Sequence, residues 1–329
     1  MHTRRLGATG PTVSAIGLGA MGMSDFYGPA DATESVATVH AAIEAGVTLI
    51  DTGDFYGMGH NELLLREALK GSKRDKVVLS VKYGALRSPN GAFLGIATDP
   101  ASTKSALAYT LQRLGVDYVD IYRPARVAPH VPIEDTVGAI ADLVKEGYVR
   151  HIGLSEAGAD TIRRAHKVHP IVDLQIEYAI ITRGVERDIL PVLRELGIGM
   201  TAYGVLSRGL ISESALAGGS ASAFRAHAPR FQGDNLKTNL TLVRALKDIA
   251  DEKRCTVAQL AIAWVAAQGE DIVPLIGARK RERLTEALAA LEVRLSAEDM
   301  ARIAAAAPAE AVAGSRYAPE QMAMLDSER

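Results

Sequence analysis

An aspartate, a tyrosine and a lysine stand at or just after the ends of two apolar segments early in the chain. The segment Thr48–Asp51 ends in the aspartate, Tyr56 follows in the next loop, and Val77–Lys82 ends in the lysine. A tyrosine has a pKa near ~10 and is a weak acid at neutral pH, but an ammonium within hydrogen-bond reach favours the phenolate and lowers that pKa. Asp51 beside Lys82 would keep the lysine charged. Such a group can protonate an oxygen that gains negative charge as a hydride reaches its carbon.

Each of these residues also has a simpler interpretation. An aspartate at a strand end often caps the next loop, and a lysine or tyrosine there is often amphipathic surface. The three together, with the loop Asp54–Glu62 between them, favour a functional site. A more distant alternative is a lyase or isomerase that uses Lys82 to form a Schiff base.

Short apolar segments that alternate with longer helical patterns must position these residues. This alternation is typical of parallel βα units, and eight of them predict an α/β fold of the (β/α)8 TIM-barrel class, as one domain over residues 1–329. Active sites of such barrels lie at the C-terminal ends of the strands. The expected strands are Ala15–Leu18, Thr48–Asp51, Val77–Lys82, Val119–Tyr122, His151–Leu154, Asp173–Ile176, Gly199–Ala202 and Ile272–Leu275.

Two features precede or overlap the first expected strand. Arg4–Leu6 and Thr12–Ser14 flank turn-forming residues and predict an N-terminal β-hairpin that closes the bottom of the barrel. The glycines of Gly17–Gly22 have the G-x-G-x-x-G spacing of a doubly wound nucleotide-binding sheet. A loop follows them where that fold needs a helix, and Asp51 lies further on than a ribose-binding acid would. We therefore interpret the glycines as a turn at the barrel mouth.

Composition limits the partners and the location. The chain has 329 residues, 48% of them hydrophobic, and a formal net charge of -2, which permits a large core and argues against a nucleic-acid or membrane-surface partner. A single cysteine, Cys255, fits a reducing compartment. Met1–Arg5 lacks an apolar stretch after its charges, so we expect no signal peptide and a cytoplasmic protein. No cluster of histidine, cysteine and aspartate has ligand spacing, so we predict no metal. The oligomeric state is not predicted.

The segment Asp51-Thr-Gly-Asp-Phe-Tyr56-Gly57 resembles the Asp-Thr-Ala-x-x-Tyr-Gly signature of the aldo-keto reductases. Val149–Glu156 and Leu174–Tyr178 resemble the bacterial and plant branch of that family, which is also similar to potassium-channel β subunits. The resemblance extends along essentially the whole chain. It implies a TIM barrel that reduces a small-molecule aldehyde or ketone with NADPH, with Tyr56 as general acid and Lys82 and Asp51 as the partners that tune it.

The resemblance also implies which residues bind NADPH/NADP+. Ser155 and Gln175 would hold the nicotinamide carboxamide, with Glu156 at an adjacent position that is often asparagine, and Tyr203 would stack on the ring. The pyrophosphate loop Gly204–Leu210 and the helix start after the last strand supply the remaining contacts. These residues are Gly204, Leu206 and Arg208 in the loop, then Gly277, with Arg279 and Arg283 for the 2′-phosphate and Glu286 for the adenine amine. We expect the long segment Ser212–Asn235 to fold over the cofactor and line the substrate pocket.

One residue of the expected site is missing. Relatives in this family read Asp-x-Tyr-x-x-His-Arg at the end of the fourth strand, and the histidine donates a hydrogen bond to the substrate carbonyl. Here Ala125 takes its position. The loss of one such donor costs on the order of a hundredfold in rate. The enzyme could accept a bulkier substrate, use another donor, or bind NADPH as a regulatory or sensor protein without useful turnover. The retained Asp51, Tyr56 and Lys82 favour an enzyme. The candidate replacement donors are Arg123, Arg126, His60 and His130.

Overall fold

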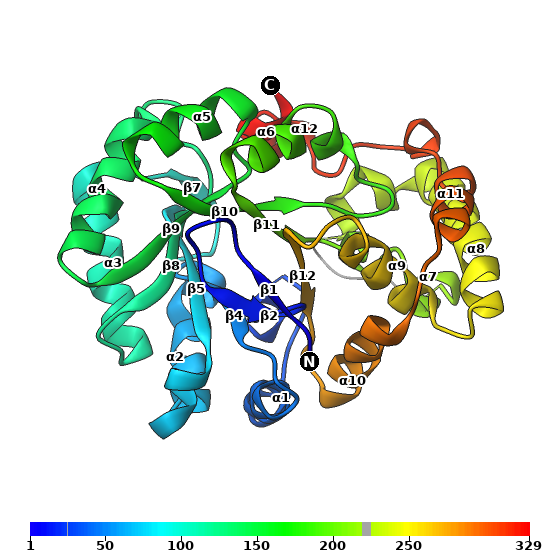
Figure 1. Cartoon of the computed structure of the whole chain (residues 1–329), viewed down its shortest axis with the longest axis horizontal. Helices are drawn as coiled ribbons and strands as arrows, with labels where there is room; N and C mark the ends of the chain where they lie inside the picture. The colour runs from blue at the N-terminus through cyan, green and yellow to red at the C-terminus, as the bar shows by residue number, and fades with distance from the viewer. Residues whose placement is uncertain (25, 219–224) are drawn as a thin grey trace.

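Eight parallel strands form a closed barrel at the centre of the computed structural model, which describes residues 1–24, 26–218 and 225–329. Neighbours around the barrel follow one another in the chain, and helices lie between them in sequence (Figure 1), so the predicted (β/α)8 TIM barrel is confirmed. The barrel strands are β3 (Gly17–Gly19), β4 (Leu49–Gly53), β5 (Val78–Tyr83), β8 (Val119–Pro124), β9 (Val149–Ser155), β10 (Ile171–Glu177), β11 (Gly199–Tyr203) and β12 (Ile272–Gly277).

The helices surround the strands (Figure 1) and begin where the sequence supplies caps. The Asp99 side chain accepts hydrogen bonds from the backbone at the start of α3, which ends at Gly115 in the left-handed region with φ of 65°. Thr256 and Gln259 form a reciprocal capping box on α9, which buries Trp264 in the core. The helices of eight or more residues are α1 (Ala32–Glu44), α2 (His60–Ala68), α3 (Pro100–Leu114), α4 (Ile133–Lys145), α5 (Ala159–Val168), α6 (Ile189–Leu196), α8 (Gly233–Glu252), α9 (Val257–Ala266), α10 (Arg281–Ala289) and α11 (Ala297–Ala306).

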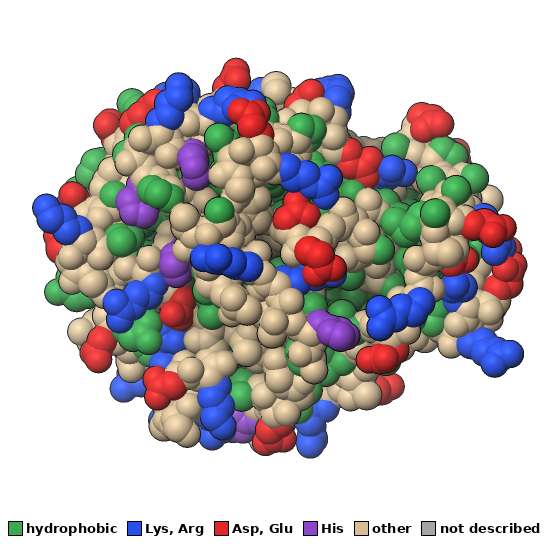
Figure 2. Space-filling view, viewed as in Figure 1, with side chains coloured by type: hydrophobic (Ala, Val, Ile, Leu, Met, Phe, Trp, Pro, Cys, Tyr) green, Lys and Arg blue, Asp and Glu red, His purple; other side chains and the backbone are tan. Residues whose placement is uncertain are grey.

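The predicted N-terminal hairpin consists of β1 (Thr3–Arg5) and β2 (Thr12–Ser14), which cross in front of the barrel in Figure 1. Leu6 and Val13 are fully buried and join a cluster of side chains from the beginnings of barrel strands. Gly7 has φ of 66°, and a Cβ there would lie 2.6 Å from the carbonyl oxygen of Val172, so only glycine fits. The hairpin therefore closes the bottom of the barrel, as predicted. On the same face, acidic and basic side chains are interspersed (Figure 2).

Two sequence-based expectations differ from the structure. Gly17–Gly19 forms β3 itself, and the turn follows as a short helix at Met21–Met23, so the interpretation of the first two glycines as a turn was wrong. A Cβ on Gly17 would lie 2.9 Å from the Leu49 side chain, which shows that glycine permits close packing of β3 on β4. The structure also adds an unpredicted hairpin after β5, made of β6 (Ala85–Arg87) and β7 (Phe93–Ile96). In the described part of the chain, no helix is long and apolar enough to cross a membrane.

A fully buried ion pair links the strands inside the barrel. Arg123 on β8 donates from Nη1 to Oδ2 of Asp173 on β10 at 2.9 Å, and neither side chain is exposed. The Thr201 hydroxyl on β11 also donates to Asp173 Oδ2, at 2.6 Å, while Arg123 Nη2 donates to Ser80 Oγ on β5 at 2.9 Å. Four barrel strands thus share one polar cluster. Removal of one charged partner would leave the other charge buried without compensation.

We expect Asp173→Ala to lower the free energy of unfolding by about 3–5 kcal/mol, the usual cost of breaking a buried pair by removing one partner. Asp142→Ala is the matched control, because Asp142 pairs with Lys104 on the surface and such exposed pairs contribute less than about 1 kcal/mol. Equilibrium unfolding in urea measures both variants. Equal losses in the two would show that the buried pair does not hold the barrel together.

Candidate active site

Asp51 and Lys82 form a buried ion pair at the C-terminal ends of β4 and β5. In the β4–β5 register Asp51 lies opposite Ser80, and Lys82 lies two residues further on. Lys82 Nζ donates to Asp51 Oδ1 and, at 2.5 Å, to Oε1 of Gln175. The other Asp51 oxygen, Oδ2, accepts hydrogen bonds from Ser80 Oγ and Gln175 Nε2, both at 2.8 Å. The aspartate is therefore fixed in position and surrounded by donors.

Tyr56 lies beside this pair, in the turn between β4 and α2. The backbone reaches the left-handed region at Gly57, Met58 and Gly59, with φ of 57°, 52° and 95°, so the chain reverses immediately after the tyrosine. Tyr56 is 5% exposed, and Lys82 Nζ lies 5.3 Å from the centre of its ring. The structure thus brings together the three residues that the sequence predicts as a proton-donating group.

Burial decides the protonation of this group. Burial, and then the charge of Asp51, raise the pKa of Tyr56 well above its ordinary value, while Arg126 acts in the opposite direction. Burial also lowers the pKa of Lys82, although Asp51 opposes this. The sequence-based expectation of a lowered Tyr56 pKa was wrong, because desolvation outweighs the nearby cation. The phenol consequently keeps its proton at neutral pH.

Ala125 directly follows β8 and occupies the predicted position of the missing histidine. Its N–H donates to the Tyr83 carbonyl at 2.8 Å, which fixes the backbone next to β5, and its side chain is buried. The prediction that Arg123 could be a replacement donor is wrong, because its guanidinium is buried in the ion pair with Asp173. The ring of His60 contacts Ser24 Oγ through Nδ1 at 2.8 Å in an exposed position, and His130 is exposed as well.

Two buried hydroxyl groups mark the predicted cofactor side of the mouth. Ser155 at the end of β9 and Ser207 after β11 each place Oγ out of contact with solvent, and within the described residues neither oxygen has a hydrogen-bond partner. Buried polar atoms are rarely left unpaired, so both hydroxyls fit polar groups of a ligand. Gln175, the other predicted carboxamide contact, instead has its side-chain amide bonded to Lys82 and Asp51.

The loop predicted to hold the pyrophosphate has an unusual backbone. Ser207 and Arg208 have φ of 47° and 60°, in the left-handed region that non-glycine residues rarely occupy, and such strain is common at ligand sites. Gly204 has φ of 67°, and a Cβ there would lie 2.9 Å from the Glu177 side chain. Arg208 Nη2 pairs with Glu177 at 2.8 Å. Leu206 is half-buried in the same loop.

The C-terminal tail supplies an arginine that sequence reasoning did not assign to the site. Arg316 donates to both carboxylate oxygens of Glu156, at 2.9 and 2.6 Å, and the Tyr203 hydroxyl donates to Glu156 Oε1 at 2.6 Å. Burial raises the pKa of Glu156, but Arg316 and other donors outweigh it and lower that pKa to about 2. The available signal was Glu156 itself, because an acid at a position that is often asparagine needs a cation when buried.

The residues predicted to bind the adenosine end gather around the start of α10. Arg279 Nη1 donates to the backbone carbonyls of Tyr27 and Gly28, at 2.9 and 3.2 Å. Arg283 pairs through Nη1 with Glu286 Oε2 at 2.8 Å and is largely exposed. Gly277 ends β12, three residues before the N-cap Lys280 of this helix. Part of the segment Ser212–Asn235 that was expected to cover the cofactor lies outside the described residues.

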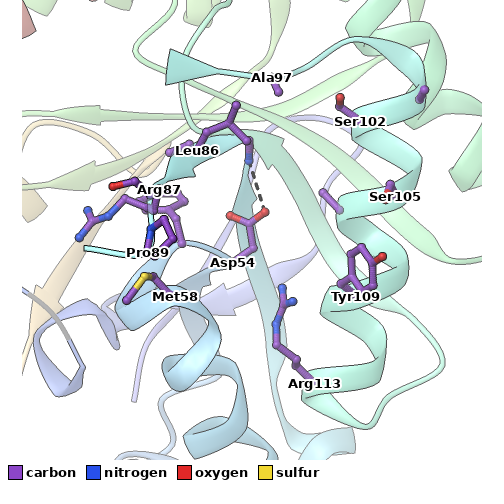
Figure 3. A pocket seen from close by; sticks show the side chains of 16 residues that line it. Asp54, Met58, Leu86, Arg87, Pro89, Ala97, Ser102, Ser105, Tyr109 and Arg113 are labelled. Atoms are coloured by element: carbon purple, nitrogen blue, oxygen red, sulfur yellow. Dashed lines mark hydrogen bonds between the residues drawn. The ribbon is translucent and has the colours of Figure 1, made fainter. Parts of the chain in front are cut away.

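A cavity of about 730 Å³ lies on the outer side of the Tyr56 loop, between the β6–β7 hairpin and α3 (Figure 3). Asp54 faces it together with side chains such as Met58 and Tyr109 (Figure 3). The Gly84 N–H donates to Asp54 Oδ2 at 3.4 Å, whereas in the described part of the chain the buried Oδ1 has no partner. Burial and the nearby Glu62 carboxylate raise the pKa of Asp54 to about 7.

Comparison with known proteins agrees with this geometry. A family model described as the aldo/keto reductase family matches residues 15–308. The chain belongs to the aldo/keto reductase family. It is 42% identical over 316 residues to the probable aldo-keto reductase 1 of Glycine max, across 95% of this chain and 91% of that protein.

Solved structures of aldo/keto reductases share the fold. A glycerol dehydrogenase from Gluconobacter oxydans is 25% identical with a TM-score of 0.82, across 93% of this chain and 96% of that one. The holo form of an aldo-keto reductase from Bacillus halodurans is 26% identical with a TM-score of 0.79, across 94% and 97% of the two chains. Membership of the family makes this protein an oxidoreductase of carbonyl compounds, in a family whose members generally use NAD(P)H.

The raised pKa of Asp54 predicts how the stability of this aldo/keto reductase depends on pH. Because the folded state holds the Asp54 proton up to a pKa of about 7, and the unfolded chain releases it near ~4, the free energy of unfolding falls as the pH rises between these values. Asp54→Asn should therefore stabilise the protein more at pH ~8 than at pH ~5 relative to wild type. Thermal unfolding at both pH values measures this difference.

Asp75→Asn is the matched control, since Asp75 is exposed and its substitution removes the same charge from the surface. If Asp54→Asn and Asp75→Asn show the same pH dependence, Asp54 does not titrate in the folded protein as the structure predicts.

Proposed function

We propose that the protein reduces an aldehyde or ketone to an alcohol with NADPH as hydride source and Tyr56 as general acid. The observation that carries this proposal is the buried cluster of Asp51, Lys82 and Gln175 beside Tyr56 at the C-terminal mouth of the barrel. A protein that only bound the cofactor would have no use for a tyrosine held in this way. Membership of the aldo/keto reductase family supports the proposal. The substrate would be a small molecule, and the reducing compartment that Cys255 fits would be the cytoplasm.

The chain offers fitting groups for the cofactor. The unpaired hydroxyls of Ser155 and Ser207 would bind its polar groups, Tyr203 would contact the nicotinamide ring, and Arg279 and Arg283 would meet the 2′-phosphate at the N-terminus of α10. A helix N-terminus with arginines favours a phosphate group. When bound, the reduced nicotinamide supplies the hydride.

The residues of the chain then handle the proton. A carbonyl oxygen that gains an electron pair becomes a much stronger base than a phenolate, so it can take the proton of Tyr56 despite the raised pKa. The Lys82 ammonium lies close to the tyrosine ring and stabilises the phenolate that remains. Asp51 holds that ammonium in place and keeps it charged. This division of roles follows from the contacts within the cluster.

Substitution of Tyr56 tests the proposed acid. Tyr56→Phe removes the proton and leaves the ring, so we expect NADPH oxidation by an aldehyde to fall by a factor on the order of 10³ or more. Binding of NADPH, measured by quenching of protein fluorescence, should stay within about twofold. Tyr109→Phe, on the exposed face of α3, is the matched control. Unchanged turnover in Tyr56→Phe would remove this residue from the mechanism, and a broad panel of aldehydes, ketones and quinones that leaves NADPH unoxidised would reject the reductase.

Arg283→Ala tests the proposed preference for NADPH. A hydrogen bond to a charged group contributes about 1.5–3 kcal/mol, so loss of this arginine should weaken NADPH binding roughly ten- to a hundredfold. NADH lacks the 2′-phosphate and should bind almost as before. Arg302→Ala, which breaks a surface pair with Glu252, is the control. Equal weakening of NADPH and NADH would contradict a contact between Arg283 and the phosphate.

A further inference from the structure

We propose that Arg126 takes over the role of the histidine that Ala125 replaces, by donating a hydrogen bond from its guanidinium to the substrate carbonyl oxygen as that oxygen gains negative charge. This inference rests on the proposed reductase function. It concerns a second donor at the reacting oxygen, next to the Tyr56 hydroxyl. The chain itself then supplies both groups that stabilise the developing alkoxide.

The backbone places Arg126 at the barrel mouth. β8 ends at Pro124, and the hydrogen bond from the Ala125 N–H to Tyr83 extends its pairing with β5 by one residue. The Arg126 side chain then bends back, so that Nη1 donates to the Ala125 carbonyl oxygen at 2.6 Å. The guanidinium is thereby tied to the residue that stands where relatives have the imidazole.

Arg126 differs from the other arginines of the barrel mouth in its partners. Arg208 pairs with Glu177, and Arg316 pairs with Glu156. In the part of the chain that the structure describes, no carboxylate lies within 4.0 Å of the Arg126 guanidinium, and its hydrogen bond goes to the Ala125 carbonyl. A guanidinium has five N–H donors, so several remain for a ligand. A half-buried cation with unused donors suits an acceptor that is negative or becomes so.

The groups around Arg126 are those of the reaction centre. Its charge lowers the pKa of Tyr56, which burial raises, and it also lowers the pKa of Lys82, which burial lowers as well. In both cases burial has the larger effect. Burial favours loss of its own charge, but electrostatic interactions with Tyr203, Tyr317 and the Glu156 carboxylate outweigh this and raise the pKa of Arg126. The guanidinium therefore stays charged, and it interacts electrostatically with both the proposed acid and the tyrosine expected to contact the nicotinamide. A fixed cation in a site shielded from water stabilises an alkoxide strongly.

The roles of Arg126 and Tyr56 stay distinct in this scheme. Hydride addition forms a C–H bond and breaks the carbonyl π bond, whose electron pair moves to oxygen. That oxygen takes its proton from Tyr56, because a guanidinium has a pKa above ~12 and does not give up a proton at neutral pH. Arg126 donates a hydrogen bond throughout and remains charged. Its loss should thus slow the chemical step without preventing cofactor binding.

The test uses the full-length protein with NADPH and two substrates, benzaldehyde and its ortho-carboxylated derivative. In Arg126→Met, which keeps an unbranched apolar stem and removes the guanidinium, kcat for both aldehydes should fall on the order of a hundredfold, while the Kd for NADPH changes less than about twofold. Arg126→Lys keeps the charge and should lose less. Arg164→Met is the matched control, because Arg164 pairs with Glu134 on the surface, and it should keep wild-type kcat.

A second pair of variants separates a donor from a structural role. Ala125→His alone should give no gain, since Arg126 already serves the oxygen, but Ala125→His combined with Arg126→Met should recover at least tenfold in kcat over Arg126→Met. A merely structural arginine would not be replaced by an imidazole at the neighbouring position.

Three results would overturn the inference. Wild-type kcat in both Arg126→Met and Arg126→Lys would exclude the donor, as would failure of Ala125→His to recover any activity in the Arg126→Met background. An effect confined to a higher KM for the carboxylated aldehyde would instead make Arg126 an anchor for a substrate carboxylate. In each of these cases, turnover by the wild-type enzyme leaves the proposed reductase function intact. If the wild-type enzyme oxidises NADPH with none of the carbonyl compounds tested, both proposals are rejected.

Discussion

The buried ion pair between Lys82 and Asp51 is the interaction on which the rest of the site depends. Two charges taken out of water are costly, and they are stable together only when further hydrogen bonds satisfy their remaining atoms. Ser80 supplies one such bond from the same strand as the lysine, and Gln175 supplies two from β10. The pair therefore requires several strands of the closed barrel, and Tyr56 acquires its environment from a cluster that only the whole fold can build.

Ser80 also joins this cluster to a second one deeper in the barrel. Its hydroxyl donates to Asp51 and accepts from Arg123, whose charge is balanced by Asp173. Arg123 is thus committed to holding strands together and is unavailable at the mouth. Three residues later, Arg126 has left the strand and has no such partner among the described residues. Of two arginines in one short segment, one is therefore committed to the barrel interior, and the other is the one that we propose for the reaction centre.

The C-terminal tail connects the proposed substrate and cofactor sides of the mouth. Arg316 and Ser327 come from the tail and hold Glu156 at the end of β9, and Glu156 in turn accepts the Tyr203 hydroxyl. Tyr203 and Tyr317 also contact each other through their hydroxyls at 3.0 Å. The position of the ring expected to contact the nicotinamide is therefore set by residues more than a hundred positions away in the chain.

The sequence alone determined the barrel, the N-terminal hairpin and the meeting of Asp51, Tyr56 and Lys82. These follow from local apolar patterns and from the fact that parallel strands bring their C-terminal ends to one mouth. Only the tertiary structure decided which of Arg123 and Arg126 reaches that mouth, that Gln175 belongs to the ion-pair cluster, and that the pKa of Tyr56 is raised. Burial and partners from distant segments control these properties, and neither is contained in the spacing of residues along the chain.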